Sequence, residues 1–277
     1  MTVHEMLSEG EDSVRHATPI SDEELVSMID YVLETRSYTA ASNPEWTVAV
    51  DSPSVHFIKR SIKSSGTVRT RSWAKVPGVP PQALFKCVYD CALRLQFDKY
   101  FTRFEVSRSI DHVTDVVVSQ LDSPVGISDR EFVEWRRCFL PELRDKSSMV
   151  YAIELRSCDD SQCSASVRPS SKRVERAETW LSGYVFKWWL DENGEPQGSE
   201  IFVMSEVDLR GSLPKLFVNT AVSSGPVKWS ASLVDAAKRL CEAQGAKDLN
   251  QREEELEELL GVKRGARALS HVLQHTS

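Results

Sequence analysis

DLRGSLPKLFVNTAV, residues 208–222, leads from a strand pattern into GPVKWSASLVDAAKRLCEA, residues 225–243. LPKLFVNTAV predicts a short helix, and the second segment predicts a final helix because its apolar residues recur every three or four positions. The apolar side of this final helix consists of Val227, Leu233, Val234, Ala237 and Leu240. A helix with one apolar face packs that face against another element, so the preceding sequence has to supply a matching apolar surface.

Strand patterns in the preceding sequence supply that surface. Short runs rich in β-branched and aromatic residues are separated by turn residues, such as the DENGEPQG sequence at 191–198, which is typical of strands joined by turns. The predicted strands are 46–50, 55–62, 67–76, 104–110, 115–121, 130–140, 148–155, 175–190 and 200–209. A strongly bent antiparallel sheet that is covered by one long helix can enclose a cavity between the two.

Two more helices are predicted from local signals. Ser21 and Glu24 have the spacing of a capping box and precede apolar residues at helical spacing, which predicts a first helix at about 22–37. The sequence VPGVPPQ introduces a second helix, with Pro81 near its first turn, where proline is well tolerated.

The chain divides into three parts by composition. Residues 1–20 are polar and predicted to be flexible, residues 21–245 form the domain, and residues 246–277 form a charged tail that starts acidic and ends basic. An exposed helix is predicted at about 249–260. It is shorter than the three or four heptads of a sustained coiled coil, but the 246–277 tail is a candidate contact for a protein partner.

Charge and composition exclude several classes of function. The 277-residue chain has a formal net charge of −7, which gives no electrostatic case for binding nucleic acid. The first residues lack the apolar stretch of a secretion signal, so we expect a cytoplasmic protein whose six cysteines are reduced. Cys87 and Cys91 lie one helical turn apart, but no His or Cys pair completes a metal set, and we expect neither a metal nor a cofactor.

Three segments together resemble a known family. LRLQFDKY at 93–100, SDREFVEWRR at 128–137 and the 208–222 segment, in this order and near these separations, resemble the START lipid-transfer family, the steroidogenic acute regulatory protein-related domains. The resemblance covers about 46–243 and is nearest to the phosphatidylcholine transfer protein branch. It implies an α+β helix-grip fold, in which a strongly curved antiparallel sheet and a long C-terminal helix enclose a hydrophobic tunnel for one lipid.

Arg94 and Asp98 are the first candidate site residues. They follow the second helix on a short helical extension, one turn apart, a spacing that is typical of a surface ion pair. The resemblance instead implies that they reach into the tunnel near the lipid headgroup. A guanidinium can hold a phosphate through two hydrogen bonds while a nearby carboxylate keeps it oriented.

Phe132, Glu134 and Arg136 alternate along one strand and therefore share one of its faces. If that face is the tunnel wall, the two charges need partners, and Glu134 with Arg136 can form a pair; if it faces outward, both are solvated. The resemblance matches Arg136 to an arginine that points into the tunnel of sterol carriers. The acidic partner on the preceding strand falls at Val117 here, so the sterol-type pair is predicted to be missing.

The resemblance also bears on the headgroup. Phe132 and Trp180 match two aromatic residues of a choline cage, which needs aromatic faces around the cation, but Ser119 and Ser182 stand at the other two positions. For ceramide a glutamine is expected near Ser119. The full set of predicted lipid-contacting residues is Arg94, Asp98, Val117, Ser119, Leu121, Phe132, Glu134, Arg136, Trp180 and Ser182, and the predicted gate consists of Leu233, Val234, Ala237 and Leu240.

The leading interpretation is a carrier of one polar lipid that makes transient contact with membranes and catalyses no reaction. A glycerophospholipid is favoured, with sterol and ceramide as alternatives. Two other functions are kept open. The same cavity could serve a lipid sensor that presents its tail or its last helix to a protein partner. It could also host an enzyme in which Arg94, Asp98 and Glu134 act as acid and base.

Overall fold

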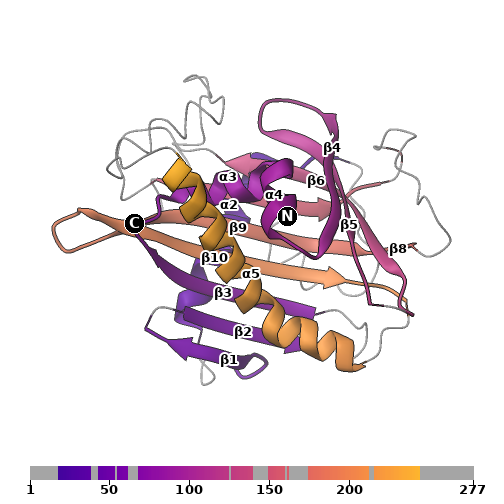
Figure 1. Ribbon diagram of the computed structural model, residues 1–277, viewed down its shortest axis with the longest axis horizontal. Coiled ribbons are helices and arrows are strands. Elements are labelled where there is room, and N and C mark those ends of the chain that lie inside the picture. The colour runs from indigo at the N-terminus through magenta and orange to yellow at the C-terminus, as the bar shows by residue number, and fades with distance from the viewer. Residues whose placement is uncertain are drawn as a thin grey trace.

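One large sheet dominates the molecule (Figure 1). The computed structural model describes residues 18–38, 43–53, 55–61, 68–124, 126–139, 149–159, 161, 174–211 and 215–243, without the side chains of 61, 68 and 215–226. The sheet is curved and unclosed, and nine of its strands follow the order β1-β2-β3-β10-β9-β7-β6-β5-β4 in antiparallel pairs. Strand β8 pairs in parallel with β6. The predicted antiparallel sheet is therefore confirmed.

The strands have the following bounds. They are β1 (Thr47–Ser52), β2 (Val55–Ser61), β3 (Val68–Pro77), β4 (Phe101–Ser109), β5 (Thr114–Leu121), β6 (Asp129–Phe139), β7 (Val150–Ser157), β8 (Val174–Arg176), β9 (Glu178–Leu190) and β10 (Pro196–Asp208). Each predicted strand has a counterpart within a few residues, because apolar residues that alternate along the chain are buried on one face of a sheet.

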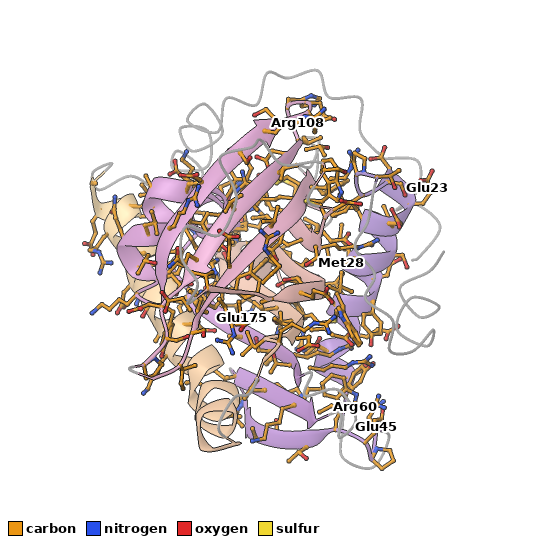
Figure 2. All side chains as sticks on the ribbon, turned by 90° about the vertical axis from the view of Figure 1, so that its right-hand side faces the viewer. Glu23, Met28, Glu45, Arg60, Arg108 and Glu175 are labelled. Carbon is orange, nitrogen blue, oxygen red and sulfur yellow. The ribbon has the colours of Figure 1, made fainter. Side chains whose placement is uncertain are left out.

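Helices cover both faces of the sheet, and the described ones are α2 (Asp22–Leu33), α3 (Pro81–Tyr89), α4 (Cys91–Phe97) and α5 (Lys215–Ala243), with a 3₁₀ turn, η1, at Glu34–Ser37. Figure 2 shows α2 and α5 on opposite sides of the strands, with Met28 pointing to the sheet and Glu23 away from it. No helix in the described ranges is long and apolar enough to span a membrane.

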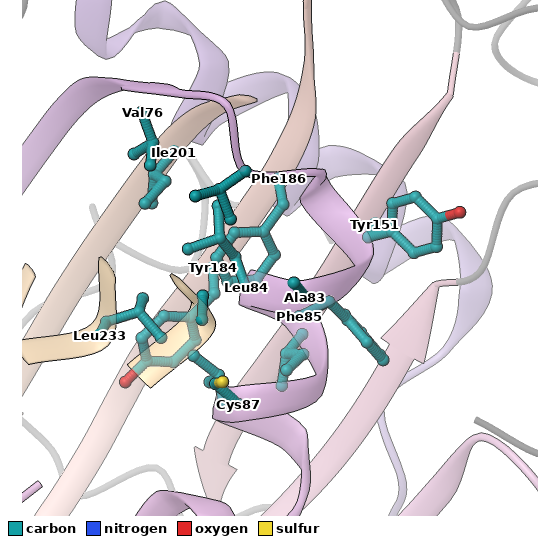
Figure 3. Close-up of a cluster of buried hydrophobic side chains, with 14 of the residues drawn as sticks. Val76, Ala83, Leu84, Phe85, Cys87, Tyr151, Tyr184, Phe186, Ile201 and Leu233 are labelled. Atoms are coloured by element: carbon teal, nitrogen blue, oxygen red, sulfur yellow. The ribbon is translucent and has the colours of Figure 1, made fainter. Parts of the chain in front are cut away.

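Two apolar cores result from this arrangement. One lies between the sheet and α2 and includes Met28 and Val185. The other lies between the sheet and helices α3 and α5. Figure 3 shows this second cluster, to which Leu233 of α5, Leu84 of α3 and Phe186 of β9 all belong. Since α5 packs on the face opposite to α2, it covers the sheet as the helix-grip fold requires.

The start of α2 confirms the capping box. The Glu24 amide donates to Ser21 Oγ at 3.3 Å, and the Ser21 amide donates to Glu24 Oε2 at 2.8 Å, so two amides that have no partner within the helix are satisfied. The helix packs closely on β9 at Gly183, where an added Cβ would lie 2.5 Å from Met28 Sδ.

Two predicted helix boundaries are wrong. The short helix at LPKLFVNTAV and the final helix form one continuous α5 of 29 residues that contains Gly225 and Pro226, because a proline removes one helical hydrogen bond without always ending the helix. The extension that carries Arg94 is a separate helix, α4, whose N-cap is Asp90. The predicted 249–260 helix lies outside the described residues.

Candidate functional site

A cavity of about 660 Å³ lies between the sheet and helices α4 and α5. Its floor is formed by residues of β3, β5, β6, β7, β9 and β10, and its volume is typical of a site that holds one small molecule. The lining residues that are exposed to solvent are Lys99, Tyr100, Asp122, Pro124 and Lys228. The cavity therefore reaches the surface where the α4–β4 turn, the β5–β6 loop and α5 come together.

Most of the predicted lipid-contacting residues line this cavity. They are Arg94, Asp98, Ser119, Leu121, Phe132, Glu134, Arg136 and Ser182. Residues that lie up to 88 positions apart in sequence are thus brought to one wall, as the resemblance implied, while their contact with a lipid stays a prediction.

Val117 and Trp180 do not line the cavity, which corrects two expectations. Val117 is fully buried in the core beside α3. Trp180 lies at an irregularity in the pairing of β9 with β10, where the register skips from Leu181 to Thr179. Such a bulge inserts one residue and breaks the alternation of faces, so Thr179 lines the cavity in place of Trp180.

Arg94 and Asp98 form a buried ion pair, which excludes the surface interpretation. Arg94 Nη2 lies 3.0 Å from Asp98 Oδ2, and Arg94 is only 5% exposed. Asp98 Oδ2 also accepts a hydrogen bond of 2.8 Å from Trp229 Nε1. Asp98 therefore links α4 to α5 across the mouth of the cavity, and Trp229 is a site residue that the sequence analysis missed.

Aromatic rings surround the Arg94 guanidinium. Its Cζ lies 5.1–5.7 Å from the ring centres of Phe97, Phe101, Phe104, Tyr184 and Trp229, within the range of cation–π attraction. Among the described residues, its Nε has no hydrogen-bond partner. The guanidinium is thus held in place by rings and by Asp98, and its Nε donor is left unused within the described residues.

Arg136 pairs with Asp115 and not with Glu134, which corrects another expectation. The two residues are directly opposite on β5 and β6. Arg136 Nε and Nη2 donate to the two Asp115 oxygens at 2.9 and 2.5 Å, and Nη1 donates to the Tyr89 carbonyl at 2.6 Å. The preceding strand therefore does supply an acidic partner, Asp115, two residues before Val117. The buried positive charge of Arg136 is balanced by this carboxylate.

Glu134 has a different environment. It is 6% exposed, lines the cavity, and forms no ion pair with any residue that the structure describes. Burial raises its pKa to about 7, although a hydrogen bond to the Thr179 side chain and the nearby Arg94 and Arg136 charges oppose that shift. Removing a carboxylate from water favours its protonated form, so Glu134 is partly neutral near pH 7.

A row of hydroxyl groups crosses the cavity floor. Ser182 of β9 is directly opposite Ser205 of β10, which is directly opposite Thr70 of β3, and all three line the cavity. Directly opposite side chains have Cβ atoms about 5 Å apart. This end of the sheet therefore offers hydrogen bonds to a ligand, whereas Val88, Ile153 and Leu155 make other parts of the wall apolar.

The four predicted gate residues lie on α5 where it meets the core. Leu233 and Ala237 are fully buried in the cluster with α3, and Val234 and Leu240 pack against the same cluster. Opening α5 would expose these side chains to water. Whether the helix opens stays a prediction, and Trp229 gives a way to test it.

Trp229→Phe is expected to loosen α5. The substitution keeps an aromatic ring but removes the hydrogen bond to the Asp98 carboxylate. We expect local opening of α5 to increase about tenfold, since a bond to a charged group is worth about 1.5 kcal/mol at the low end. Hydrogen exchange of the α5 amides measures this. Trp189→Phe, a half-buried tryptophan of β9 that packs on Lys75, is the matched control, and unchanged exchange in Trp229→Phe would show that the bond does not hold α5 closed.

Comparison with known proteins agrees with this geometry. The START domain family model matches residues 31–243. Human StAR-related lipid transfer protein 5 superposes with a TM-score of 0.61 at 20% identity, over 78% of this chain and 96% of that chain. Human STARD10 gives a TM-score of 0.66 at 17% identity, over 93% and 92%, and the human StarD13 lipid transfer and protein localization domain gives 0.54 at 14%, over 76% and 95%.

At these identities the solved structures show a common fold and nothing more, and a search of the curated proteins gave no match. The nearness to the phosphatidylcholine transfer branch stays a prediction. The family model, in contrast, covers well over half of the chain with a single match. From this match, and from a curved sheet with a cavity under its last helix, we conclude that the chain belongs to the START domain family.

Proposed function

We propose that this protein carries one polar lipid in the cavity and transfers it between membranes from the cytoplasm, without a covalent step. The observation that supports this most directly is the cavity itself, with the Arg94–Asp98 ion pair in its wall and the amphipathic helix α5 above it. Membership of a family with lipid-transfer members gives independent support.

The physical need for such a carrier is large. Exposing an acyl chain to water costs about 0.8 kcal/mol for each CH₂, so a chain of about fifteen carbons costs roughly 12 kcal/mol. A cavity with Val88, Ile153 and Leu155 in its wall removes much of that cost during transit. Transfer therefore requires binding and release, and no bond of the lipid has to break.

A glycerophospholipid is the favoured ligand. Its phosphate needs a cation in the cavity wall, and Arg94 lines the cavity, with a buried Nε that has no hydrogen-bond partner among the described residues. The mouth also suits a membrane surface. The exposed Lys99 and Lys228 lie at the rim, and each lysine near an anionic bilayer contributes roughly 1 kcal/mol to membrane binding.

The two alternative functions would use the same cavity. The enzyme function is less favoured than the sensor function because Asp98 is held in an ion pair with Arg94 and by a hydrogen bond from Trp229.

Filling the cavity should abolish most lipid binding. Ser205→Phe places a large ring on the cavity floor, at a half-buried strand position where an aromatic residue is well tolerated. We expect the amount of phospholipid extracted from vesicles to fall roughly tenfold, as it would for a loss of about 1.4 kcal/mol of binding free energy. Mass spectrometry of the lipid that co-purifies, together with a vesicle-to-vesicle transfer assay, measures this. Ser109→Phe, at the exposed end of β4, is the control, and undiminished binding by Ser205→Phe would place the lipid elsewhere.

A further inference from the structure

Glu134 differs from every other buried carboxylate in the ranges that the structure describes. Nine aspartates and glutamates are buried there, and eight of them form an ion pair. The pairs are Asp98 with Arg94, Asp115 with Arg136, Glu131 with Arg176, Glu154 with Arg156, Glu178 and Asp208 with Arg210, Glu200 with Arg36, and Glu206 with Arg69. Glu134 is the ninth, and it is the one that lines the cavity without a cation.

Charge balance in the cavity wall sharpens this difference. Among the buried charges of the wall, Arg94 and Asp98 cancel, and Arg136 and Asp115 cancel, so an ionised Glu134 leaves these buried groups with a net charge of −1. A buried charge that stays unpaired is costly. A ligand that brings a positive group to Glu134 removes this cost, whereas a ligand with a net negative headgroup increases it.

Several hydroxyl groups line the same cavity as Glu134. Its carboxyl is hydrogen-bonded to the Thr179 side chain. The Ser182 hydroxyl donates to the Met204 carbonyl at 3.5 Å, which leaves its oxygen free to accept. The hydroxyls of Ser119 and Ser205 form no hydrogen bond with any residue described by the structure and can turn either way. A group with several N–H donors suits this set.

The aromatic rings of the cavity argue against a quaternary ammonium group. Such a cation has no N–H and needs ring faces around it. Phe101, Phe104, Tyr184 and Trp229 already surround the Arg94 guanidinium, and Trp180 lies off the cavity wall. The cation cage of this cavity is thus filled by the protein itself.

We propose that Glu134 binds the primary ammonium group of a zwitterionic phospholipid, a phosphoethanolamine headgroup, while Arg94 faces the phosphate of the same headgroup. The proposal rests on the proposed function and names its ligand class. A primary ammonium has three donors, which suit the Glu134 carboxylate and hydroxyl oxygens of the cavity wall such as that of Ser119 on the adjacent strand. The zwitterion gives Glu134 the cation that it lacks and adds no net charge, whereas an anionic headgroup would add a second negative charge beside Glu134.

The first experiment uses the unchanged full chain. Vesicles are made with phosphatidylethanolamine, its N-methyl and N,N-dimethyl derivatives, or phosphatidylcholine, all with the same acyl chains, and the transfer of each lipid is measured. We expect transfer to fall stepwise as N–H donors are lost, by about tenfold from the first lipid to the last, since a charge-assisted bond exceeds a neutral contact by about 1.4 kcal/mol. A flat series, or transfer that rises as N–H donors are lost, overturns the proposal.

The second experiment assigns the preference to one residue. Glu134→Gln keeps the shape of the side chain and removes its charge. We therefore expect the ratio of phosphatidylethanolamine transfer to phosphatidylcholine transfer to fall about tenfold in this variant. Glu192→Gln makes the same change at an exposed position of the turn between β9 and β10, outside the cavity lining, and should leave the preference unchanged. If Glu134→Gln does not fold by circular dichroism, the methylation series in the unchanged chain decides.

The outcomes separate the two proposals. No transfer of any phospholipid by the unchanged chain would overturn the proposed function, and with it the assignment of Glu134. Equal transfer of all four lipids, or an equal loss of all four in Glu134→Gln, would overturn the assignment of Glu134 alone and would leave the lipid carrier in place. Selectivity that disappears only in Glu134→Gln supports both.

Discussion

Asp115→Asn is expected to lower the free energy of unfolding by about 3–5 kcal/mol, because it leaves the Arg136 guanidinium buried without its charge partner. Arg136 donates two hydrogen bonds to Asp115, and its third goes to the Tyr89 carbonyl. An asparagine can accept only one of the two bonds to position 115 and carries no charge. Urea unfolding, followed by circular dichroism at pH 7, measures the difference.

Glu134→Gln is the matched comparison, because Glu134 was the partner of Arg136 that the sequence suggested. Burial raises the pKa of Glu134 to about 7, above its usual value near 4.5. The stability that Glu134 contributes is therefore fully present below about pH 4.5 and is lost as the pH rises through about 7. A glutamine does not ionise. As the pH rises from 5 to 8, the free energy of unfolding should therefore fall less in the variant than in the unchanged chain.

The two variants together test the pairing. We expect Asp115→Asn to lower the free energy of unfolding strongly at both pH 5 and pH 8. We expect Glu134→Gln to lower it slightly at pH 5, and to lower it less, or to raise it, at pH 8. Similar losses in the two variants would mean that Glu134 shares Arg136 after all. A loss for Asp115→Asn below about 1 kcal/mol would mean that the pair is no stronger than an exposed ion pair.

The same pair shows where sequence reasoning stopped short. Alternation along one strand correctly placed Glu134 and Arg136 on one face, but it does not say which residue lies opposite on the next strand. A signal was available. If the predicted strands 115–121 and 130–140 pair as an antiparallel hairpin, Leu121 and Arg130, which flank the connecting loop, lie opposite each other. The same register places Asp115 opposite Arg136, as the structure has them.

The wider fold was predictable because it depends on local patterns that repeat. Strand alternation, the Ser21–Glu24 capping box and the amphipathic final helix each have a short-range physical cause, and each was confirmed. Features with a long-range cause were missed. The bulge beside Thr179 depends on how β9 pairs with β10, and the contact of Trp229 with Asp98 joins two helices that are 131 residues apart at these positions.

Arg94→Ala is expected to reduce phospholipid transfer by ten- to a hundredfold, the largest functional effect that we foresee. Loss of a charge-assisted hydrogen bond to a phosphate in a dry site costs about 1.5–3 kcal/mol. Arg94 lines the cavity, is buried, and keeps its Nε without a partner among the described residues. Transfer of phosphatidylethanolamine and phosphatidylcholine should fall alike, because both carry the phosphate.

Stability has to be separated from binding in this test, since Arg94→Ala also leaves the Asp98 carboxylate buried with only the Trp229 hydrogen bond. Transfer is therefore measured per folded molecule, with the folded fraction taken from an unfolding curve of the same sample. Arg94→Lys retains the positive charge but not the planar fork of donors, and it should recover part of the transfer. Arg108→Ala, at an exposed position of β4 near one end of the molecule (Figure 2), is the control for the loss of one arginine. If Arg94→Ala transfers phospholipid as fast as the Arg108→Ala control, Arg94 has only a structural role in joining α4 to the aromatic rings around it, and the phosphate has to be held by another group of the cavity.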